Sequence, residues 1–262
     1  MRPIFLLCLA AALAAATPAV RAAPALADGE TLVYHVGWGI LIGAGEIRIT
    51  AKNAPPENGH PRLLVTTTTS TRTLARIFFK FDARSESLFD EETGRLLSTT
   101  ETSTSDRKNT SDHVTFDYAN STAHYVNDLE PAKSKTIPMP PGQPLDLIMS
   151  LIQTRTWNLQ PGEKRDALVI FDDEFYELTI HAEDYEEVRT PVGSFRTLAL
   201  VPRMEKTPPK GMFKRGSSVR VWISQDDRRL PVKFQVDFKI GAGVATLVSY
   251  TPPTKEQPAG HP

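Results

Sequence analysis

In the stretch TLVYHVGW, residues 31–38, apolar side chains occupy every second position. Successive side chains of an extended strand point to opposite faces, so this alternation gives the strand one apolar face. That face consists of Leu32, Tyr34, Val36 and Trp38. Further strand-like segments follow at 46–51, 63–71, 78–89, 113–118, 167–171, 175–181, 195–201, 219–224, 232–240 and 244–250. The sequence therefore predicts a mainly β protein, built as a single large curved antiparallel sheet or as a partly open β-barrel.

One segment, residues 143–157, has a helical pattern instead. Its apolar side chains recur at positions i, i+3, i+4 and i+7, the stripe of an amphipathic helix. That stripe consists of Leu145, Ile148, Met149 and Ile152. Pro144 suits the first helical position and Asp146 suits the positive end of the helix dipole. We expect one amphipathic helix of about 12 residues near 144–157, covering a face of the sheet or plugging an open end.

The N-terminus has the features of a secretory signal peptide. Arg2 supplies a positive charge, residues 4–16 are apolar, and Val20-Arg21-Ala22 offers small residues for cleavage. The apolar run is shorter than the roughly 20 residues that span a bilayer, which disfavours a retained anchor. We expect residues 1–22 to be removed, Cys8 with them, and the mature chain to work in the periplasm without a transmembrane span.

The mature chain excludes several classes of function by composition. Loss of Arg2 and Arg21 leaves 28 basic residues against 31 acidic ones, a net charge of −3, which does not suit nucleic-acid binding. Without cysteine it has no disulfide and no thiolate chemistry. Its histidines stand at no strong metal-ligand spacing, so we expect neither a metal nor a cofactor.

The domain organisation expected is one β-rich domain at 23–252, followed by a disordered tail at 253–262. Residues 131–144 hold five prolines and offer the alternative of a linker between two β halves. The repeat of Ile-Gly-Ala-Gly at 42–45 and 240–243 would fit an internal duplication, but glycines at bends of a curved sheet explain it equally well.

No motif assigns a reaction. The chain lacks the Gly-x-Ser-x-Gly elbow, the His-Glu-x-x-His motif and a phosphate loop, so no catalytic residue is proposed. The acidic runs 172–174 and 183–187 offer paired carboxylates for glycoside hydrolysis, although they suit a hairpin turn and a solvated strand end better. The basic stretch 203–220 carries Phe213 at an aromatic tip and offers a loop for lipid or a partner protein.

The most distinctive stretch is VWISQDDRRLPV, residues 221–232, which reads as a hairpin whose aspartates bond backbone amides of the turn. Together with residues 29–34 and the helical segment it resembles the bacterial exported family called domain of unknown function 3108. The positions that carry the resemblance are Trp222, Ser224, Asp226, Arg229 and Pro231. The resemblance implies periplasmic placement and a curved or barrel-like antiparallel sheet, but no activity. We interpret the motif as structural.

These observations favour a non-enzymatic periplasmic protein that shelters a lipid or another apolar ligand for envelope maintenance. Hydroxyl side chains alternate to both faces in 66–70, as suits a wide, partly hydrated barrel wall. The ligand-lining candidates are Trp38, Phe78, Phe81, Phe213 and Trp222, and the alternative for each of them is a place in the hydrophobic core. The alternatives are an envelope scaffold that binds another protein and an envelope glycan hydrolase.

Overall fold

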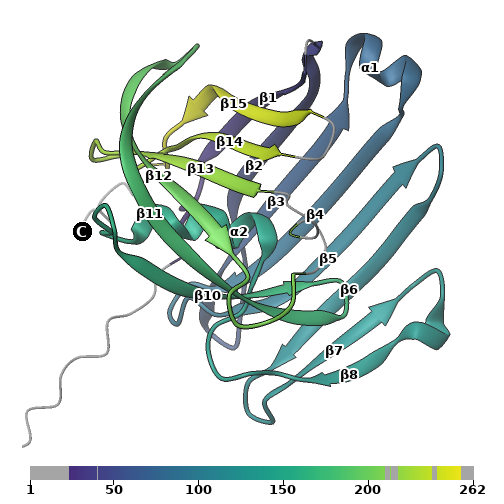
Figure 1. The fold of residues 1–262 in the computed structure, drawn as a ribbon. Coiled ribbons are helices and arrows are strands. Elements are labelled where there is room, and N and C mark those ends of the chain that lie inside the picture. Colours follow the sequence, from purple (N-terminus) through teal and green to yellow (C-terminus); the bar gives the residue numbers. More distant parts are fainter. Residues whose placement is uncertain (1–23, 40, 210–212, 214–217, 238–240, 255–262) are drawn as a thin grey trace, which may run out of the picture.

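Strands dominate the protein, and all of them belong to one sheet (Figure 1). The computed structural model describes residues 24–39, 41–209, 213, 218–237 and 241–254. The expected signal peptide, 1–22, and most of the expected tail, 255–262, lie outside the described residues. Neighbouring strands follow the order β8-β7-β6-β5-β4-β3-β2-β1-β15-β14-β13-β12-β11-β10-β9. The prediction of a single large, mainly antiparallel sheet is confirmed.

The strands on the β1 side form a meander of consecutive hairpins. They are β1 (Thr31–Trp38), β2 (Leu41–Glu57), β3 (His60–Thr71), β4 (Phe81–Asp90), β5 (Leu96–Ser105), β6 (Asn109–Asp117), β7 (Thr122–Asn127) and β8 (Lys135–Pro138). β8 occupies part of the proline-rich segment 131–144, after the 3-10 helix η1 (Pro131–Lys133). The segment 131–144, for which the sequence offers a linker between two β halves as an alternative, therefore supplies an edge strand of the sheet.

The other side of the sheet is a second meander. Its strands are β9 (Leu145–Asp146), β10 (Lys164–Phe171), β11 (Glu174–Thr190), β12 (Gly193–Arg203), β13 (Ser218–Ser224), β14 (Pro231–Asp237) and β15 (Ala242–Thr251). β9 pairs with β10 in parallel, and the other strand pairs are antiparallel. β15 pairs with β1 and joins the two meanders.

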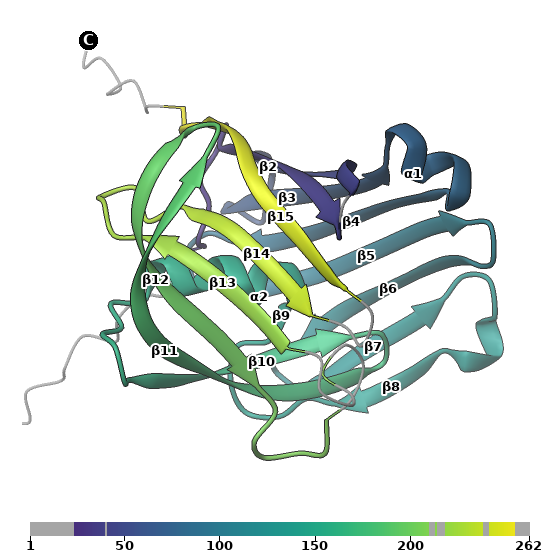
Figure 2. The ribbon, with the colours of Figure 1, turned by 45° about the horizontal axis from the view of Figure 1, so that its top comes forward.

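The sheet curls around the helix α2 (Leu147–Gln153), and Figures 1 and 2 show α2 between the two meanders. The sheet order ends at β8 on one side and β9 on the other, so no ladder of hydrogen bonds closes a barrel. An ion pair crosses from β8 to the β10–β11 turn, where Lys135 Nζ lies 2.6 Å from Asp173 Oδ2. The fold is a curved, open sheet rather than a closed barrel.

Apolar alternation places the core inside this curve. Leu32 and Tyr34 of β1 are fully buried, and so is Leu63 of β3. Met149 and Ile152 of α2 are at most 1% exposed. These residues belong to one hydrophobic cluster, which also holds the apolar side chains of β5 to β7. A second cluster lies on the opposite face of β12 and β13, which are consequently buried on both faces.

The predicted helix is present but shorter than expected. Leu145 and Asp146 pair with β10, and the α-helix begins after Asp146, whose carboxylate accepts a hydrogen bond from the backbone N–H of Met149 at 2.8 Å. Asp146 is thus an N-cap, a role that short polar side chains fill well. A turn of 3-10 helix, η2 (Thr154–Thr156), follows α2. The predicted start at Pro144 was wrong because strand pairing and the cap delay the helix.

A second helix was not expected from the sequence. α1 (Thr73–Phe78) connects β3 to β4, so Phe78 ends a helix and β4 begins only at Phe81. The expectation that residues 78–89 form one strand was therefore wrong at its start. α1 has six residues and buries none of them. Its apolar side chains Leu74, Ile77 and Phe78 have the helical i, i+3, i+4 spacing, but the segment is too short for periodicity to detect.

Candidate functional site

An apolar groove of about 720 Å³ opens at the end of the sheet beside α1. Its volume lies within the range of about 300–1,000 Å³ that small-molecule sites usually have. The lining residues are Val36, Trp38, Ala44, Gly45, Thr69, Ser70, Thr71, Ala75, Phe78, Phe79, Phe81 and Arg107. Of these described lining residues, Arg107 alone carries a charge.

The groove is formed by strands β1 to β4 together with the connection that holds α1. β2 approaches β3 closely at Gly45, where an added Cβ would lie 2.9 Å from the backbone oxygen of Ser70. Thr71 Oγ1 accepts a hydrogen bond from the N–H of Phe81 at 2.9 Å, so the two ends of the connection are tied together. Glycine at position 45 therefore permits the close strand packing that forms the floor of the groove.

Two ion pairs fix α1 over the ends of the strands. Arg76 donates to both carboxylate oxygens of Asp82 on β4, at 2.9 and 2.7 Å. Arg72 Nη2 lies 2.8 Å from Glu46 Oε1 on β2. The Asp82 pKa is lowered, chiefly by its hydrogen bond to Arg76. Because α1 buries no side chain, these polar contacts define its position.

Aromatic side chains give the groove its apolar character. Phe79 and Phe81 stack with ring centroids 6.1 Å apart and an angle of 9° between the ring planes. Phe78 is 83% exposed and Trp38 is 42% exposed. Large exposed aromatic side chains around a groove are unusual on a protein surface unless the surface contacts something apolar.

A second cavity of about 340 Å³ continues from the groove into the interior of the curved sheet. The two cavities share Thr69 and Phe81. The deeper one is also lined by Leu147 and Ile148 at the start of α2 and by Ile170. A path therefore leads from the exposed end of the sheet to the N-terminus of α2, apolar in the groove and lined by both apolar and charged side chains in the deeper cavity.

Carboxyl groups line the inner part of this path. Burial raises the pKa of Asp112 to about 6, and nearby carboxylates add to the shift. Glu101, which pairs with Asp112 across β5 and β6, is exposed, but partial desolvation and the Asp112 carboxylate raise its pKa in the same direction. Burial also raises the pKa of Asp146, even though the backbone N–H of Met149 and the hydroxyl of Ser87 both donate to it. Asp112 is therefore partly protonated at a mildly acidic pH, which lowers the negative charge of the inner cavity.

The structure places the five ligand-lining candidates in different parts of the molecule. Trp38, Phe78 and Phe81 line the groove together, although they come from β1, α1 and β4. Phe213 is half-buried and packs against the second hydrophobic cluster. Trp222 is buried in the first cluster and lies away from the groove. Sequence reasoning placed Val36 on the strand face of Trp38 without naming it as a lining residue. It did not identify Ala75, Phe79 or Arg107, because only the fold brings them near Trp38.

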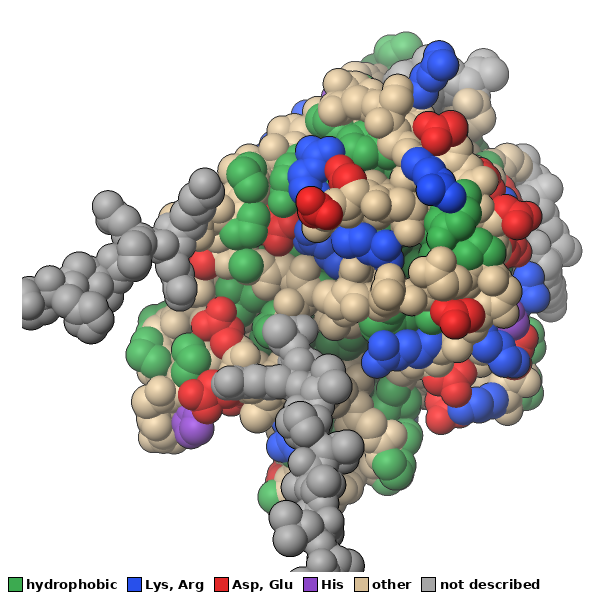
Figure 3. Space-filling view, turned by 90° about the vertical axis from the view of Figure 1, so that its left-hand side faces the viewer, with side chains coloured by type: hydrophobic (Ala, Val, Ile, Leu, Met, Phe, Trp, Pro, Cys, Tyr) green, Lys and Arg blue, Asp and Glu red, His purple; other side chains and the backbone are tan. Residues whose placement is uncertain are grey.

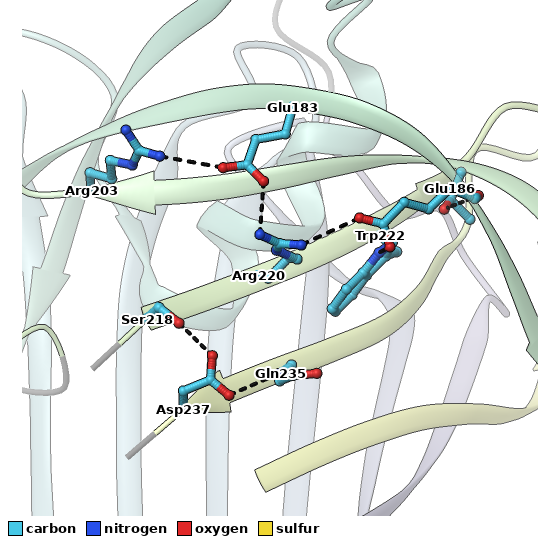
Figure 4. A network of polar contacts seen from close by, with 9 residues as sticks. Glu183, Glu186, Arg203, Ser218, Arg220, Trp222, Gln235 and Asp237 are labelled. Carbon is cyan, nitrogen blue, oxygen red and sulfur yellow. Dashed lines mark hydrogen bonds and ion pairs between the residues drawn. The ribbon is translucent and has the colours of Figure 1, made fainter. Parts of the chain in front are cut away.

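Trp222 belongs to a polar network instead (Figure 4). Its indole N–H donates to Glu186 Oε2 at 2.8 Å, and Lys233 Nζ lies 4.2 Å from the ring centroid. Arg220 bridges Glu186 and Glu183, with its shorter contact to Glu183 Oε2 at 2.8 Å. The acidic run 183–187 is therefore not a solvated strand end, because it lies inside β11 and Glu183 and Glu186 both pair with Arg220 of β13. This network gives Trp222 a structural role.

The hairpin between β13 and β14 is held by a compact set of hydrogen bonds. The fully buried Ser224 accepts from the N–H of Leu230 at 2.7 Å and donates to Asp226 at 2.6 Å. Arg229, which has a φ of 49°, donates to the backbone oxygen of Trp157 at 2.8 Å. Pro231 accepts at its carbonyl from the hydroxyl of Tyr34 at 2.8 Å. These contacts connect the hairpin to β1 and to the segment after α2.

Other charged groups do not form a site within the part of the chain that the structure describes. No group of three or more His, Cys, Asp or Glu residues there could hold a metal ion. Lys206 of the basic stretch pairs with Asp166 and Glu177, while Lys210, Lys214 and Arg215 lie outside the described residues. On the face shown in Figure 3, basic and acidic side chains alternate rather than gather by sign. Among the described residues, no helix has both the length and the apolar character of a membrane span.

Comparison with solved structures supports the fold. A β-barrel-like protein of domain of unknown function 1849 from Brucella abortus matches with a TM-score of 0.53 at 8% identity, covering 87% of this chain and 99% of that one. A candidate exported protein with a YmcC-like fold from Bacteroides fragilis matches with a TM-score of 0.33 at 11% identity, over 86% of this chain and 97% of that one. At 8% identity the likeness to the Brucella abortus protein concerns the fold alone, and no argument rests on the second match.

Comparison of sequences gives the family but no activity. No curated protein matches the chain. The model of a family described as proteins of unknown function matches residues 33–248, which include every strand of the sheet from β2 to β14. That match also contains the hairpin on which the resemblance was based. The chain therefore belongs to the family of proteins of unknown function DUF3108.

Proposed function

We propose that this protein is a non-enzymatic carrier or binder of a single-chain amphiphile, such as a fatty acyl group, in the bacterial envelope. The observation that carries the proposal is the apolar groove at Trp38, Phe78 and Phe81, which continues inward past Thr69. An acyl chain would lie between the aromatic rings and extend toward α2. Its polar head would stay at the mouth, where Arg107 is the charged lining group.

Burial of the chain supplies the driving force. Each CH₂ group that leaves water contributes about 0.8 kcal/mol, so a chain of eight buried carbons contributes roughly 6 kcal/mol before the cost of association. Thr69 and Thr71 line the groove from β3, which pairs with β2. The backbone of β3 therefore presents no unpaired hydrogen-bonding groups to the ligand. Affinity would therefore depend on chain length more than on headgroup.

The compartment is part of the proposal. The positive charge, short apolar run and small residues of 1–22 support export and cleavage near Ala23, and placement in the periplasm follows from that. The expected domain limits, 23–252, likewise remain a prediction. N-terminal sequencing of the protein isolated from the periplasm would test both the compartment and the cleavage.

The binding itself is tested with a fluorescent fatty acid whose emission depends on its environment. We expect saturable binding to the delipidated protein, weakened about tenfold by Phe81→Ala, because the ring contributes roughly 1.5 kcal/mol of contact with the chain. Trp38→Ala should act in the same direction. Leu129→Ala is the matched control, because Leu129 is 55% exposed and lies outside both cavities.

Native mass spectrometry of protein from its host gives an independent measurement, since a bound lipid adds a defined mass. Absence of saturable binding for acyl probes of several lengths, with wild-type folding, would refute the proposal. Recovery of a stoichiometric envelope protein in place of lipid would favour the scaffold alternative.

A further inference from the structure

The surface around the mouth of the groove is unusually apolar for an exposed helix. Leu74 is 63% exposed and Ile77 is 76% exposed, and neither lines the groove. Phe78, next to them on α1, is 83% exposed. Figures 1 and 2 show α1 at the periphery of the fold, beyond the ends of β3 and β4. Three large side chains therefore project from one short, peripheral element.

The same corner of the molecule is basic. The segment 71–80 contains Arg72, Arg76 and Lys80 and no carboxylate. The adjacent β5–β6 turn contributes Arg107, which lines the groove, and Lys108. Lys108 faces the carboxylates of a separate cavity, among them Asp172 and Glu130. The carboxylates that contact the segment 71–80 are Glu46, Asp82 and Asp106, so with Arg107 four cations face three anions, whereas the whole chain has a formal net charge of −1.

Some of the basic side chains at this corner form ion pairs, and others do not. Arg72 and Arg76 form ion pairs with Glu46 and Asp82. Within the described residues, the side chains of Lys80 and Arg107 form no ion pair, and both are exposed. Apolar side chains flanked by free cations are the combination by which proteins bind the interface of an anionic bilayer.

We infer that α1 docks the protein on anionic bilayers, with Leu74, Ile77 and Phe78 entering the acyl boundary. Lys80 and Arg107 then lie at the depth of the lipid phosphates. In this orientation the groove opens directly onto the bilayer, because Phe78 belongs both to the docking tip and to the groove lining. The docking surface stands on its own observations, and only the passage of the ligand from bilayer to groove rests on the proposed function.

Charge and shape favour a bilayer over a second copy of the chain. A self-interface at this corner would bring Lys80 and Arg107 close to the same cations of the other copy. α1 presents isolated apolar tips rather than the broad, flat apolar area that stable dimers bury. A lipid phosphate layer, by contrast, supplies both the negative charge and the apolar depth.

The test measures binding of the full chain, as purified from its host, to phosphatidylcholine vesicles with and without phosphatidylglycerol. We expect wild type to bind the anionic vesicles at least tenfold more tightly, and the difference to fall at high salt. Leu74→Ser with Ile77→Ser should weaken that binding by at least about tenfold. Lys80→Glu should weaken it about fivefold.

Matched control variants show whether a loss of vesicle binding is specific to the exposed side chains of α1. Leu129→Ser removes another exposed apolar side chain, which is 55% exposed and does not line the groove, and Lys52→Glu reverses an exposed charge on β2. Both should bind vesicles within twofold of wild type. Melting temperatures are recorded for every variant, and residues 1–22 are the same in all of them, so neither unfolding nor a retained leader explains a difference.

The docking inference and the proposed ligand binding can be refuted independently, because vesicle binding and probe binding are measured separately. The double variant at Leu74 and Ile77 should bind the fatty-acid probe in solution as wild type does, whereas Phe81→Ala should bind the probe about tenfold more weakly and bind the vesicles as wild type does. Equal vesicle binding by wild type and the double variant would overturn the inference. So would a wild-type dimer that the double variant converts to a monomer, since the tip would then be a self-interface.

Discussion

Replacing Glu30 by glutamine should destabilise the protein by about 3 kcal/mol. Glu30 is 3% exposed, and its Oε1 lies 2.6 Å from Nη1 of Arg155, a residue that also donates to the backbone oxygen of Arg228 at 2.7 Å. The pair therefore connects the segment before β1, the end of α2 and the β13–β14 hairpin. Few other single contacts join three such distant parts of the chain.

The magnitude follows from burial. Breaking one partner of a buried ion pair costs about 3–5 kcal/mol, since the remaining charge stays out of water without compensation. Glutamine keeps an oxygen that accepts one hydrogen bond from Arg155, which places the expected cost at the lower end. For a chain of this size the melting temperature should fall by about 6–12 °C.

The measurement is equilibrium unfolding in urea at pH 7 for a double-mutant cycle with Arg155→Met. The double variant should lose at least about 1 kcal/mol less than the two single losses added together. Glu130→Gln is the control, because Glu130 and Lys133 are also 2.6 Å apart but both are more than half exposed. That variant should lose less than about 0.5 kcal/mol. Equal losses for the buried and the exposed pair would refute the reasoning.

Three further predictions concern the interior, the β13–β14 hairpin and the seam of the sheet, where β8 meets the β10–β11 turn. Burial raises the Asp112 pKa from 3.8 to about 6, so between these values the folded protein holds a proton that the unfolded chain has lost. At 1.36 kcal/mol per pH unit, stability should fall by at most about 3 kcal/mol as pH rises from 4 to 6, and Asp112→Asn should flatten this slope in urea titrations. Ser224→Ala should cost about 2 kcal/mol in the same assay, because the buried N–H of Leu230 loses its side-chain acceptor; a loss below 0.5 kcal/mol would contradict the structural role of the motif. Lys135→Ala removes the ion pair to Asp173 and should speed hydrogen exchange in β8 while leaving β1 unchanged, and uniform exchange in both strands would show that the pair does not hold the seam.

The strands were the most predictable part of the structure. β1 matches the alternating stretch 31–38 residue for residue, and its apolar face is the one that enters the core at Leu32 and Tyr34. Alternating apolar residues indicate which face of a strand is buried, so they predict a strand correctly wherever one of its faces packs against the core. This pattern fails at α1, whose six residues bury nothing and whose position depends on ion pairs with β2 and β4.

The candidate site was predictable only in part, because it depends on residues that are distant in sequence. An exposed aromatic at the end of a strand and a buried one in the core have the same local pattern, as Trp38 and Trp222 show. What separates them is the partner of each ring, such as Glu186 beside Trp222, some 36 positions away. The register of the curled sheet decides these neighbours, and no single segment encodes it.

The position of β1 in the sheet has a consequence for how the chain is completed. β1 pairs with β2 on one side and with β15 on the other, and the second pairing joins Thr31 to Thr251. During synthesis from the N-terminus, the first strand made therefore waits with one bare edge until the last strand exists. Closing that contact across the whole chain is slow, and an open edge invites pairing with another molecule in the meantime. A nascent chain cut short before β15 would keep two bare edges, on β1 and on β14, and would be a target for aggregation or proteolysis however well its other strands had formed.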